Sequence, residues 1–144
     1  MRAKQSFDYR IMNKEFRMIN EKQKRKFDLE ERLIGFAVLI IEISENLNNT
    51  RAGNHIGGQL VRSGTSPALH YGEAQSAESR NDFVHKLKIL LKELRETLVA
   101  LKIIKRVSLT KKINDVEKGI TECNELISIF VRSIETARKN IKSK

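Results

Sequence analysis

Apolar residues recur at intervals of three and four along nearly the whole chain after residue 28, and this periodicity limits what the chain can fold into. The longest series starts at Ile113 and ends at Ile141. Three earlier series occupy residues 29–47, 56–74 and 83–101. Such spacing places the side chains of each series on one face of an α-helix. Four long amphipathic helices with short connections predict an all-α fold, an antiparallel up-down-up-down four-helix bundle.

Polar residues predict where these helices begin, because a side-chain oxygen can accept a hydrogen bond from a free N–H group of the first turn. The candidate starts are, in chain order, Asp28, Thr50, Ser79 or Asn81, and Ser108 or Thr110. Asparagines at positions 46, 48 and 49 are expected to end the first helix. Pro67 lies inside the second helix, and we expect it either to kink that helix near Ser63 and Gly64 or to break it there.

The charge of the chain is unevenly distributed. Net charge is +10 overall. Residues 1–26 carry +6, residues 27–48 carry −4, and both 80–104 and 105–144 are positive. We therefore divide the chain into a basic N-terminal extension, residues 1–26, and a four-helix bundle, residues 27–144. This asymmetry favours an anionic partner such as nucleic acid, whereas the alternative is that the excess charge only keeps a small bundle in solution.

The N-terminal extension mixes aromatic and basic residues, a combination suited to nucleic acid through base stacking and phosphate pairing. Its most basic run comprises Lys22, Lys24, Arg25 and Lys26. Two alternatives stay open. The extension could pack on a neighbouring molecule, or translation could start at Met12 or Met18 rather than Met1, which would shorten it.

A second group of basic residues lies in the third helix and the connection after it. It comprises Lys88, Lys92, Arg95 and Lys102 on one side of the helix, followed by Lys105, Arg106, Lys111 and Lys112. Such a patch can follow a phosphate backbone. It can equally be a solvated face, with Lys92 and Glu96 as an ion pair one turn apart. The residue types suggest no base-specific recognition.

Apolar residues outside the main series indicate contacts between subunits. They are Val38, Leu39 and Ile41 in the first helix, Val99 and Ile103 in the third, and Leu126, Ile129 and Val131 in the fourth. A helix in a monomeric bundle needs only one buried face, so a second apolar strip predicts a homo-oligomer. The alternative is a core face that is simply wide.

Candidates for catalysis or metal binding are weak. Cys123 falls within the apolar series of the fourth helix, which is typical of a small core residue. His55, His70 and His85 lie without a repeated ligand one turn away. We therefore expect no enzyme activity, no metal and no cofactor. The chain shows no signal peptide and no apolar run of membrane length, so we expect a cytoplasmic protein without a membrane partner.

A motif with a distinctive order of residues joins the second and third helices. It consists of Arg62, Ser63, Gly64, Thr65, Ser66 and Pro67, then Glu73, and finally Asp82 and Phe83. The hydroxyl groups could bind phosphate. In the structural interpretation they bond to carbonyl groups near Pro67, Arg62 pairs with Glu73 or Asp82, and Asp82 belongs to a helix start.

This motif resembles that of the four helix bundle proteins, the S23 ribosomal or 23S-rRNA-intervening-sequence family, which share their fold with the accessory variability protein of diversity-generating retroelements. The resemblance covers about residues 27–138. The chain has Pro67 where many relatives have none. The resemblance implies a pentameric ring without catalytic residues. It also implies nucleic acid as a partner, with RNA favoured, and a reverse transcriptase or an rRNA element as a further candidate partner.

Overall fold

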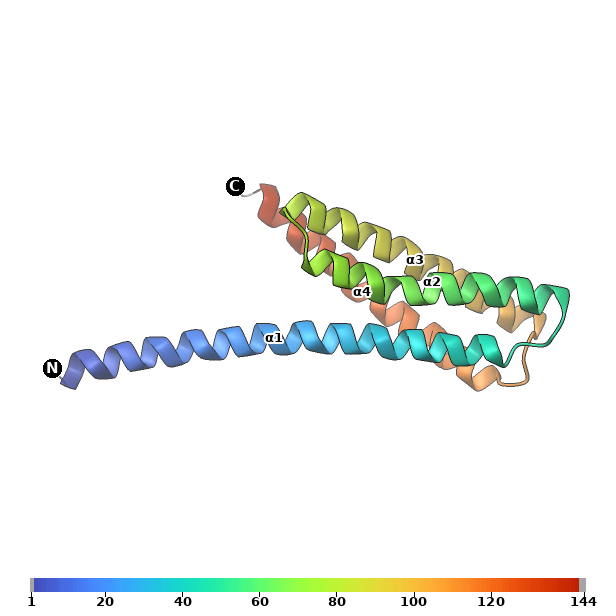
Figure 1. Cartoon of the computed structure of the whole chain (residues 1–144), viewed down its shortest axis with the longest axis horizontal. Helices are drawn as coiled ribbons and strands as arrows, with labels where there is room; N and C mark the ends of the chain where they lie inside the picture. The colour runs from blue at the N-terminus through green and yellow to red at the C-terminus, as the bar shows by residue number, and fades with distance from the viewer. Residues whose placement is uncertain (1, 143–144) are drawn as a thin grey trace. The chain divides into compact units, whose positions relative to one another are not determined.

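The computed structural model describes the backbone of residues 2–142 and the side chains of residues 11–22, 24 and 28–141. Within that part the secondary structure is entirely helical (Figure 1). The helices are α1 (Arg2–Glu45), α2 (Arg51–Gln75), α3 (Arg80–Val107) and α4 (Ile113–Lys142). The predicted all-α class is therefore confirmed. Over the same residues, none of the helices has an apolar stretch that could cross a bilayer.

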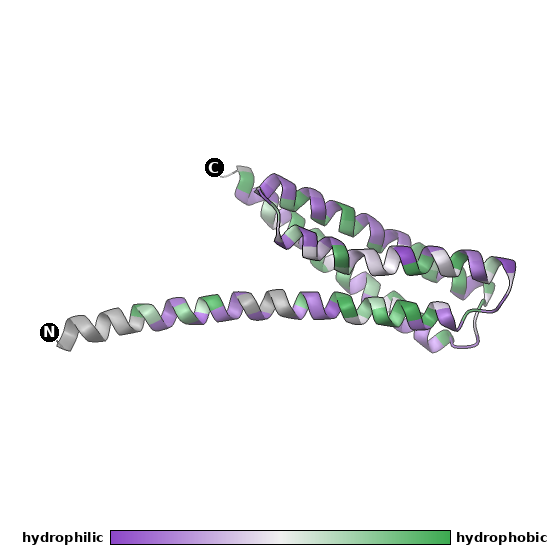
Figure 2. Ribbon diagram, viewed as in Figure 1, coloured by the Kyte–Doolittle hydropathy of each residue, from purple (hydrophilic) through white to green (hydrophobic). Residues whose placement is uncertain are grey.

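The chain forms two compact units, Met1–Arg32 and Leu33–Lys144. The second unit has a continuous apolar core, to which the last part of α1 contributes Leu33, Phe36, Ile40 and Ile43. Each predicted apolar series supplies fully buried side chains to this core, among them Leu60, Leu90 and Phe130. Figure 2 shows these apolar positions in green along each helix. The extension and bundle boundary predicted after residue 26 stays a prediction.

The apolar residues predicted to form subunit contacts divide into a buried and an exposed group. Leu126, expected at a subunit contact, is fully buried in the core, so the wide-face alternative holds for it. Val38 and Ile41 on α1 and Val99 and Ile103 on α3 are exposed instead. These four residues therefore remain available for contacts outside the subunit.

Two of the predicted helix starts are confirmed. Thr50 Oγ1 accepts a hydrogen bond from the N–H of Gly53, and Ser79 Oγ accepts one from the N–H of Asp82, each at 3.0 Å. The start predicted at Asp28 is wrong, because α1 begins at Arg2. Residues 2–27 contain neither Gly nor Pro, so nothing interrupts the helix before Asp28 and the capping signal there is not used.

The fourth helix starts later than expected, at Ile113. Ser108 adopts a left-handed conformation (φ 56°) and ends α3, its N–H pointing at the carbonyl groups of Ile104 and Lys105. Thr110 donates its hydroxyl hydrogen to the Asn46 carbonyl at 2.9 Å and accepts from the N–H of Lys112. Both predicted starts therefore belong to the connection: Ser108 ends α3, and Thr110 ties the connection to Asn46, directly after α1.

α2 runs without a break through Pro67, so the alternative that the helix breaks near Ser63 and Gly64 is wrong. Pro67 lacks the N–H that would bond four residues back. Neighbouring hydroxyl groups bond to carbonyl groups of this turn: Thr65 Oγ1 donates to Val61 and Ser66 Oγ to Arg62, each at 2.7 Å. These bonds match the structural interpretation of the motif.

α1 and α2 approach each other closely at Gly64. A Cβ atom placed there would lie 2.6 Å from Cγ2 and 2.8 Å from Cγ1 of Ile40, and Ile40 is fully buried. The side chain of Ile40 thus fills the space where residue 64 would otherwise carry a methyl group. Gly58, six residues earlier in α2, has no neighbouring atom within 4 Å of such a position.

We predict that Gly64→Ala destabilises the protein by about 1–3 kcal/mol, because the buried Ile40 has to move out of a packed position. Gly58→Ala is the matched control, and there the better helix propensity of alanine should stabilise by up to about 1 kcal/mol. Urea denaturation followed by circular dichroism measures both. Equal stability of the two variants would contradict the tight contact.

Candidate nucleic-acid interface

A strip of basic side chains covers the outer face of α3. Lys88, Lys92, Arg95 and Lys102 are all exposed, and their spacing of four, three and seven residues keeps them on one side of the helix. Arg106 continues the strip and is also exposed. The opposite side of α3 carries the buried Leu87, Leu90 and Leu94, so burial of the core face turns the basic face outward.

These cations are not neutralised locally. Among the described side chains, Lys88, Lys92, Arg95 and Lys102 form no ion pair within 4.0 Å. No ion pair within 4.0 Å joins Lys92 to Glu96, whose carboxylate bonds to Arg62, although the charge of Lys92 also contributes to the lowered pKa of Glu96. We call Lys88, Lys92, Arg95 and Lys102 the α3 basic strip.

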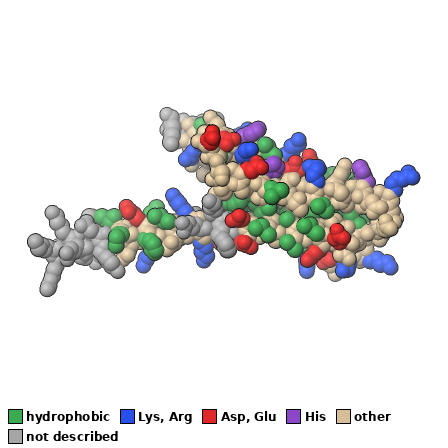
Figure 3. All heavy atoms as spheres, viewed as in Figure 1, with side chains coloured by type: hydrophobic (Ala, Val, Ile, Leu, Met, Phe, Trp, Pro, Cys, Tyr) green, Lys and Arg blue, Asp and Glu red, His purple; other side chains and the backbone are tan. Residues whose placement is uncertain are grey.

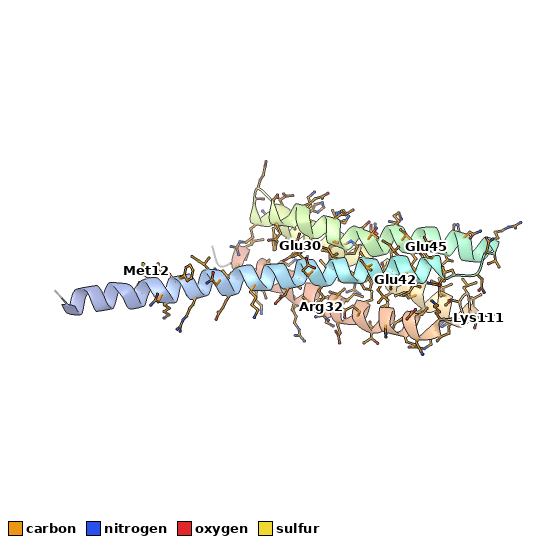
Figure 4. All side chains as sticks on the ribbon, turned by 60° about the horizontal axis from the view of Figure 1, so that its bottom comes forward. Met12, Glu30, Arg32, Glu42, Glu45 and Lys111 are labelled. Carbon is orange, nitrogen blue, oxygen red and sulfur yellow. The ribbon has the colours of Figure 1, made fainter. Side chains whose placement is uncertain are left out.

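The remaining basic candidates differ in their surroundings. Lys105 forms an ion pair with Glu117 at 2.7 Å, with both side chains about half exposed. Lys111 and Lys112 are exposed in the connection between α3 and α4, where Figure 4 labels Lys111. On α1, Lys22 and Lys24 are exposed, whereas the side chains of Arg25 and Lys26 lie outside the described residues. Lys105 is therefore the least available of the cations that the structure describes.

The α3 basic strip borders an open groove of about 750 Å³ between α2 and α3. The groove contains the apolar side chains of Ile56, Leu91, Val99, Ala100 and Ile103, and the cations of Lys88, Lys92, Arg95 and Arg62 lie among them. Sequence reasoning missed Ile56 and Leu91 as surface groove residues because both belong to apolar series. The available signal was the pair Val99 and Ile103, which lie outside the main series of α3.

Arg62 joins the two walls of this groove. Its guanidinium donates to Glu93 Oε2 at 3.1 Å and to Glu96 Oε2 at 2.8 Å. The carboxylate partner expected from sequence, Glu73 or Asp82, is thus wrong. The hydrogen bond from Arg62 lowers the pKa of Glu96. The positive charge of Arg62 is therefore paired with these two carboxylates. The contact also fixes α2 to α3 beside the basic strip.

A buried hydrogen bond supports the same junction. Thr97 Oγ1 donates to the Glu93 carbonyl at 2.8 Å and is hydrogen-bonded to Ser63 Oγ at 3.0 Å. Both residues are almost completely buried. Ser63 is therefore occupied with α3 and is not presented to a phosphate group.

The later part of the motif has structural surroundings as well. Glu73 accepts a hydrogen bond from Lys86 Nζ at 3.3 Å, and this contact lowers the pKa of Glu73. His70 Nδ1 lies 3.6 Å from Glu73, too far for a hydrogen bond. Asp82 lies in the first turn of α3 and Phe83 is half-buried. These residues link α2 to α3 and bring together no reactive set.

The structure brings no metal-binding or nucleophilic cluster together among the residues it describes. Over those residues, no three His, Cys, Asp or Glu side chains gather around a point. Cys123 is fully buried on α4, and its thiol donates to the Leu94 carbonyl at 3.1 Å. Burial raises the pKa of this thiol to about 12, so the reactive thiolate is disfavoured.

Comparison with known proteins identifies the family. The chain matches the 23S rRNA-intervening sequence protein model over residues 25–132, and it therefore belongs to this family, as its motif indicated. A solved protein of unknown function from the S23 ribosomal protein family of Bacteroides thetaiotaomicron VPI-5482 is similar in structure, with a TM-score of 0.67 and 30% identity. That alignment covers 73% of this chain and 96% of the other. No curated protein matches the chain.

We predict that Arg62→Gln raises the pKa of Glu96 toward its ordinary value, because the hydrogen bond that favours the carboxylate is lost. Glu73 provides the control, since Lys86 rather than Arg62 lowers its pKa. Carboxyl carbon NMR titration measures both groups. Glu96 contributes to folding stability at pH values above its unfolded-state pKa. This contribution is lost as the pH falls through its lowered folded-state pKa. An unchanged Glu96 titration would contradict the assigned contact.

Proposed function

We propose that this protein is a non-enzymatic, homo-oligomeric helical bundle that binds nucleic acid, with RNA favoured over DNA. The observation that carries the proposal is the α3 basic strip: four exposed cations on one helix face, with no ion pair among the described residues. Unpaired cations in a row are suited to phosphate groups in a row. Each one that neutralises a phosphate releases a counterion, which is the main source of such affinity.

The length of the strip supports contact with several phosphates. Lys88 and Lys102 are 14 residues apart, which corresponds to about 21 Å along a helix. Arg106, Lys111 and Lys112 extend the basic surface toward the end of the bundle. Lysine predominates, and a compact ammonium group pairs with phosphate without reading a base edge. The proposed binding therefore depends on charge and shape rather than on sequence.

RNA is favoured because the chain belongs to a family whose members are named for an intervening sequence of 23S rRNA. An accessory role beside an rRNA element or a reverse transcriptase is the corresponding proposal for a partner. The family resemblance also makes a pentamer the expected assembly. Five copies at +10 each would carry about +50, a charge that strongly attracts nucleic acid at low salt. Location in the cytoplasm stays a prediction.

The proposal includes the antiparallel up-down-up-down topology and a kink of α2 near Pro67. Two contacts between α2 and α3 support an antiparallel arrangement of these helices, because a later residue of α2 meets an earlier residue of α3. Arg62 bonds to Glu96 whereas Glu73 bonds to Lys86. The missing N–H of Pro67 and the hydroxyl bonds from Thr65 and Ser66 support the kink.

A protein–protein scaffold is the second candidate function, and the apolar side chains of the α2–α3 groove favour it. Val99 is 56% exposed and Ile103 is 40% exposed. Contact with a protein partner would remove the unfavourable free energy of exposing these apolar side chains to water. In this case the positive charge would serve solubility. The two functions differ in one observable, because the scaffold predicts an intact oligomer without nucleic-acid affinity at physiological salt.

We predict steeply salt-dependent binding of a structured RNA, measured by fluorescence anisotropy against a matched DNA duplex. Between about 50 and 200 mM salt the affinity should fall on the order of 10³-fold or more, because many phosphate contacts release counterions. Absence of binding at the lower salt concentration would refute the nucleic-acid function and leave the scaffold.

Two triple variants that lose the same positive charge test which surface binds nucleic acid. We expect Lys88→Gln, Lys92→Gln and Arg95→Gln together to reduce the slope of log affinity against log salt by about 2 to 3. The control replaces three exposed cations elsewhere, Arg51→Gln, Lys118→Gln and Lys139→Gln, and should change the slope less. Neutralising Lys22, Lys24, Arg25 and Lys26 tests the extension in the same assay. Equal slopes for the first two variants would show that net charge alone matters.

A further inference from the structure

The bundle part of α1 is apolar on two opposite sides. Residues 33–41 contain no charged or polar side chain. One side supplies buried residues to the core, whereas Ile34, Val38 and Ile41 on the other side are 42–48% exposed. Figure 3 shows hydrophobic side chains gathered on a face of the bundle with carboxylates beside them. A helix that is apolar all round is normally covered all round, so this outer side fits a partner.

The charge beside this outer side is negative. Residues 33–50 include Glu42 and Glu45 but no Lys or Arg. Both glutamates are exposed (Figure 4), and neither forms an ion pair within 4.0 Å with a described side chain. Glu45 follows Val38 by seven residues and Ile34 by eleven, and both intervals keep side chains on one line of a helix. We call Ile34, Val38 and Glu45 the α1 outer row.

The groove between α2 and α3 contains a row of the opposite charge. Val99 lies four residues before Ile103 and seven after Lys92, so these three side chains also share one line of a helix. All three are exposed and line the groove, and Ile56 adds an apolar side chain from α2. The groove lining includes four basic side chains and one carboxylate, so its net charge is positive. We call Lys92, Val99 and Ile103 the α3 groove row.

We propose that the α1 outer row of one copy packs antiparallel on the α3 groove row of the next copy. The inference deepens the homo-oligomeric part of the proposed function and rests on it. Charge complementarity selects the occupant, because an acidic apolar row meets a basic apolar one. The contact joins two different surfaces, so every copy offers one of each. Such a contact repeats from copy to copy and closes into a ring, which is compatible with the expected pentamer.

The spacing of the two rows selects the antiparallel orientation. Placing Val38 beside Val99 also places Ile34 beside Ile103, because each pair of apolar residues is separated by four positions. The glutamate of one row then meets the lysine of the other, since each lies seven positions from its valine. In parallel orientation the same valine pair would place Ile34 beside Arg95. Only the antiparallel register therefore matches apolar with apolar and acidic with basic side chains.

The proposed contact leaves most of the α3 basic strip for nucleic acid. Lys88, Arg95 and Lys102 are spaced by seven residues and form a row of their own. The α3 groove row lies closer to the side of α3 that contacts α2, where Glu96 bonds to Arg62. Of the four strip cations, the register therefore pairs only the lysine of the groove row with the next copy.

Light scattering of the full-length protein tests the docking. We expect Ile34→Ser with Val38→Ser to lower the mass of the assembly to that of a single chain. Val99→Ser with Ile103→Ser should have the same effect, because a ring needs both surfaces on every copy. An unchanged mass for either of these docking variants would overturn the proposal.

The matched control is Met12→Ser with Ile19→Ser. These side chains are 59% and 54% exposed in the earlier part of α1, and they belong to neither row. The control should keep the mass of the wild-type assembly. Dissociation of the control to single chains would show that exposed apolar side chains hold the assembly together without the proposed selectivity, and would overturn the docking.

A mixture of the two docking variants distinguishes a contact between different surfaces from a twofold contact. The α1 variant keeps its groove and the α3 variant keeps its α1 outer row. One contact per pair can therefore form, and growth then stops. We expect the mixture to show twice the mass of either variant alone. A mixture that stays at the mass of a single chain up to the highest soluble concentration would overturn the proposal.

Cysteine cross-linking tests the register. Oxidation of the double variant Glu45→Cys with Lys92→Cys should give a ladder of covalent oligomers, and neither single variant should cross-link. The native Cys123 is buried and does not compete. In a parallel charge test, Glu45→Lys and Lys92→Glu should each lower the assembly mass, and their combination should restore it. Cross-linking of a single variant, or absence of the ladder, would overturn the proposed arrangement.

RNA anisotropy keeps the docking and the nucleic-acid function distinguishable. The suitable variant is Ile34→Ser with Val38→Ser, which loses no charge. An RNA-binding oligomer whose mass ignores these substitutions would overturn the docking alone. An oligomer that depends on both rows but has no RNA affinity would overturn the nucleic-acid function alone. A monomeric wild-type chain would contradict both the docking and the homo-oligomeric part of the proposed function.

Discussion

Close contact between α1 and α2 is the constraint on which the arrangement of the bundle surface depends. Ile40 occupies the space beside Gly64, which only a residue without a Cβ atom leaves free. The adjacent residue of α2, Ser63, is buried against Thr97 of α3. α2 is therefore held between α1 and α3 at a single level of the bundle. The small residues of the SGTSP segment serve this packing, and the hydroxyl groups that could have bound a phosphate are already engaged.

The position of the basic strip follows from that packing. Because Leu87, Leu90 and Leu94 must face the core, the residues on the other side of α3 face solvent. Arg62 reaches from α2 to Glu93 and Glu96, so its single positive charge offsets part of the negative charge of these two carboxylates. Lys88, Lys92 and Arg95 form no ion pair within 4.0 Å among the described side chains. A structural ion pair thus increases the positive potential of the neighbouring surface, since it occupies the anions that would otherwise pair with these cations.

The core could be predicted from the sequence because the 3.6-residue periodicity depends only on local geometry. Thr50 and Ser79 were likewise predictable, since a cap acts within one turn. Asp28 carried the same local signal, but the residues before it contain no helix breaker, and the helix continues through it. The partners of Arg62 were not predictable: Glu93 and Glu96 lie more than 30 residues further on, and only the packing of α2 on α3 selects them from several carboxylates. Leu126 shows the same limit, because spacing alone did not assign it to the core.

The uneven charge of the chain can serve two different purposes, and the surroundings of each cation distinguish them. On α3 the cations border a groove and no acidic stretch of the same helix balances them, which suits a long external polyanion. On α1 a basic stretch and an acidic stretch follow one another in a single helix, each with an exposed apolar strip. Nucleic-acid bases can stack on the aromatic ring of Phe16, whereas the exposed aliphatic side chains of Met12 and Ile19 suit an apolar partner. Cations and exposed apolar side chains therefore occur together in both regions, and the feature that distinguishes α1 is the acidic stretch that follows its basic one.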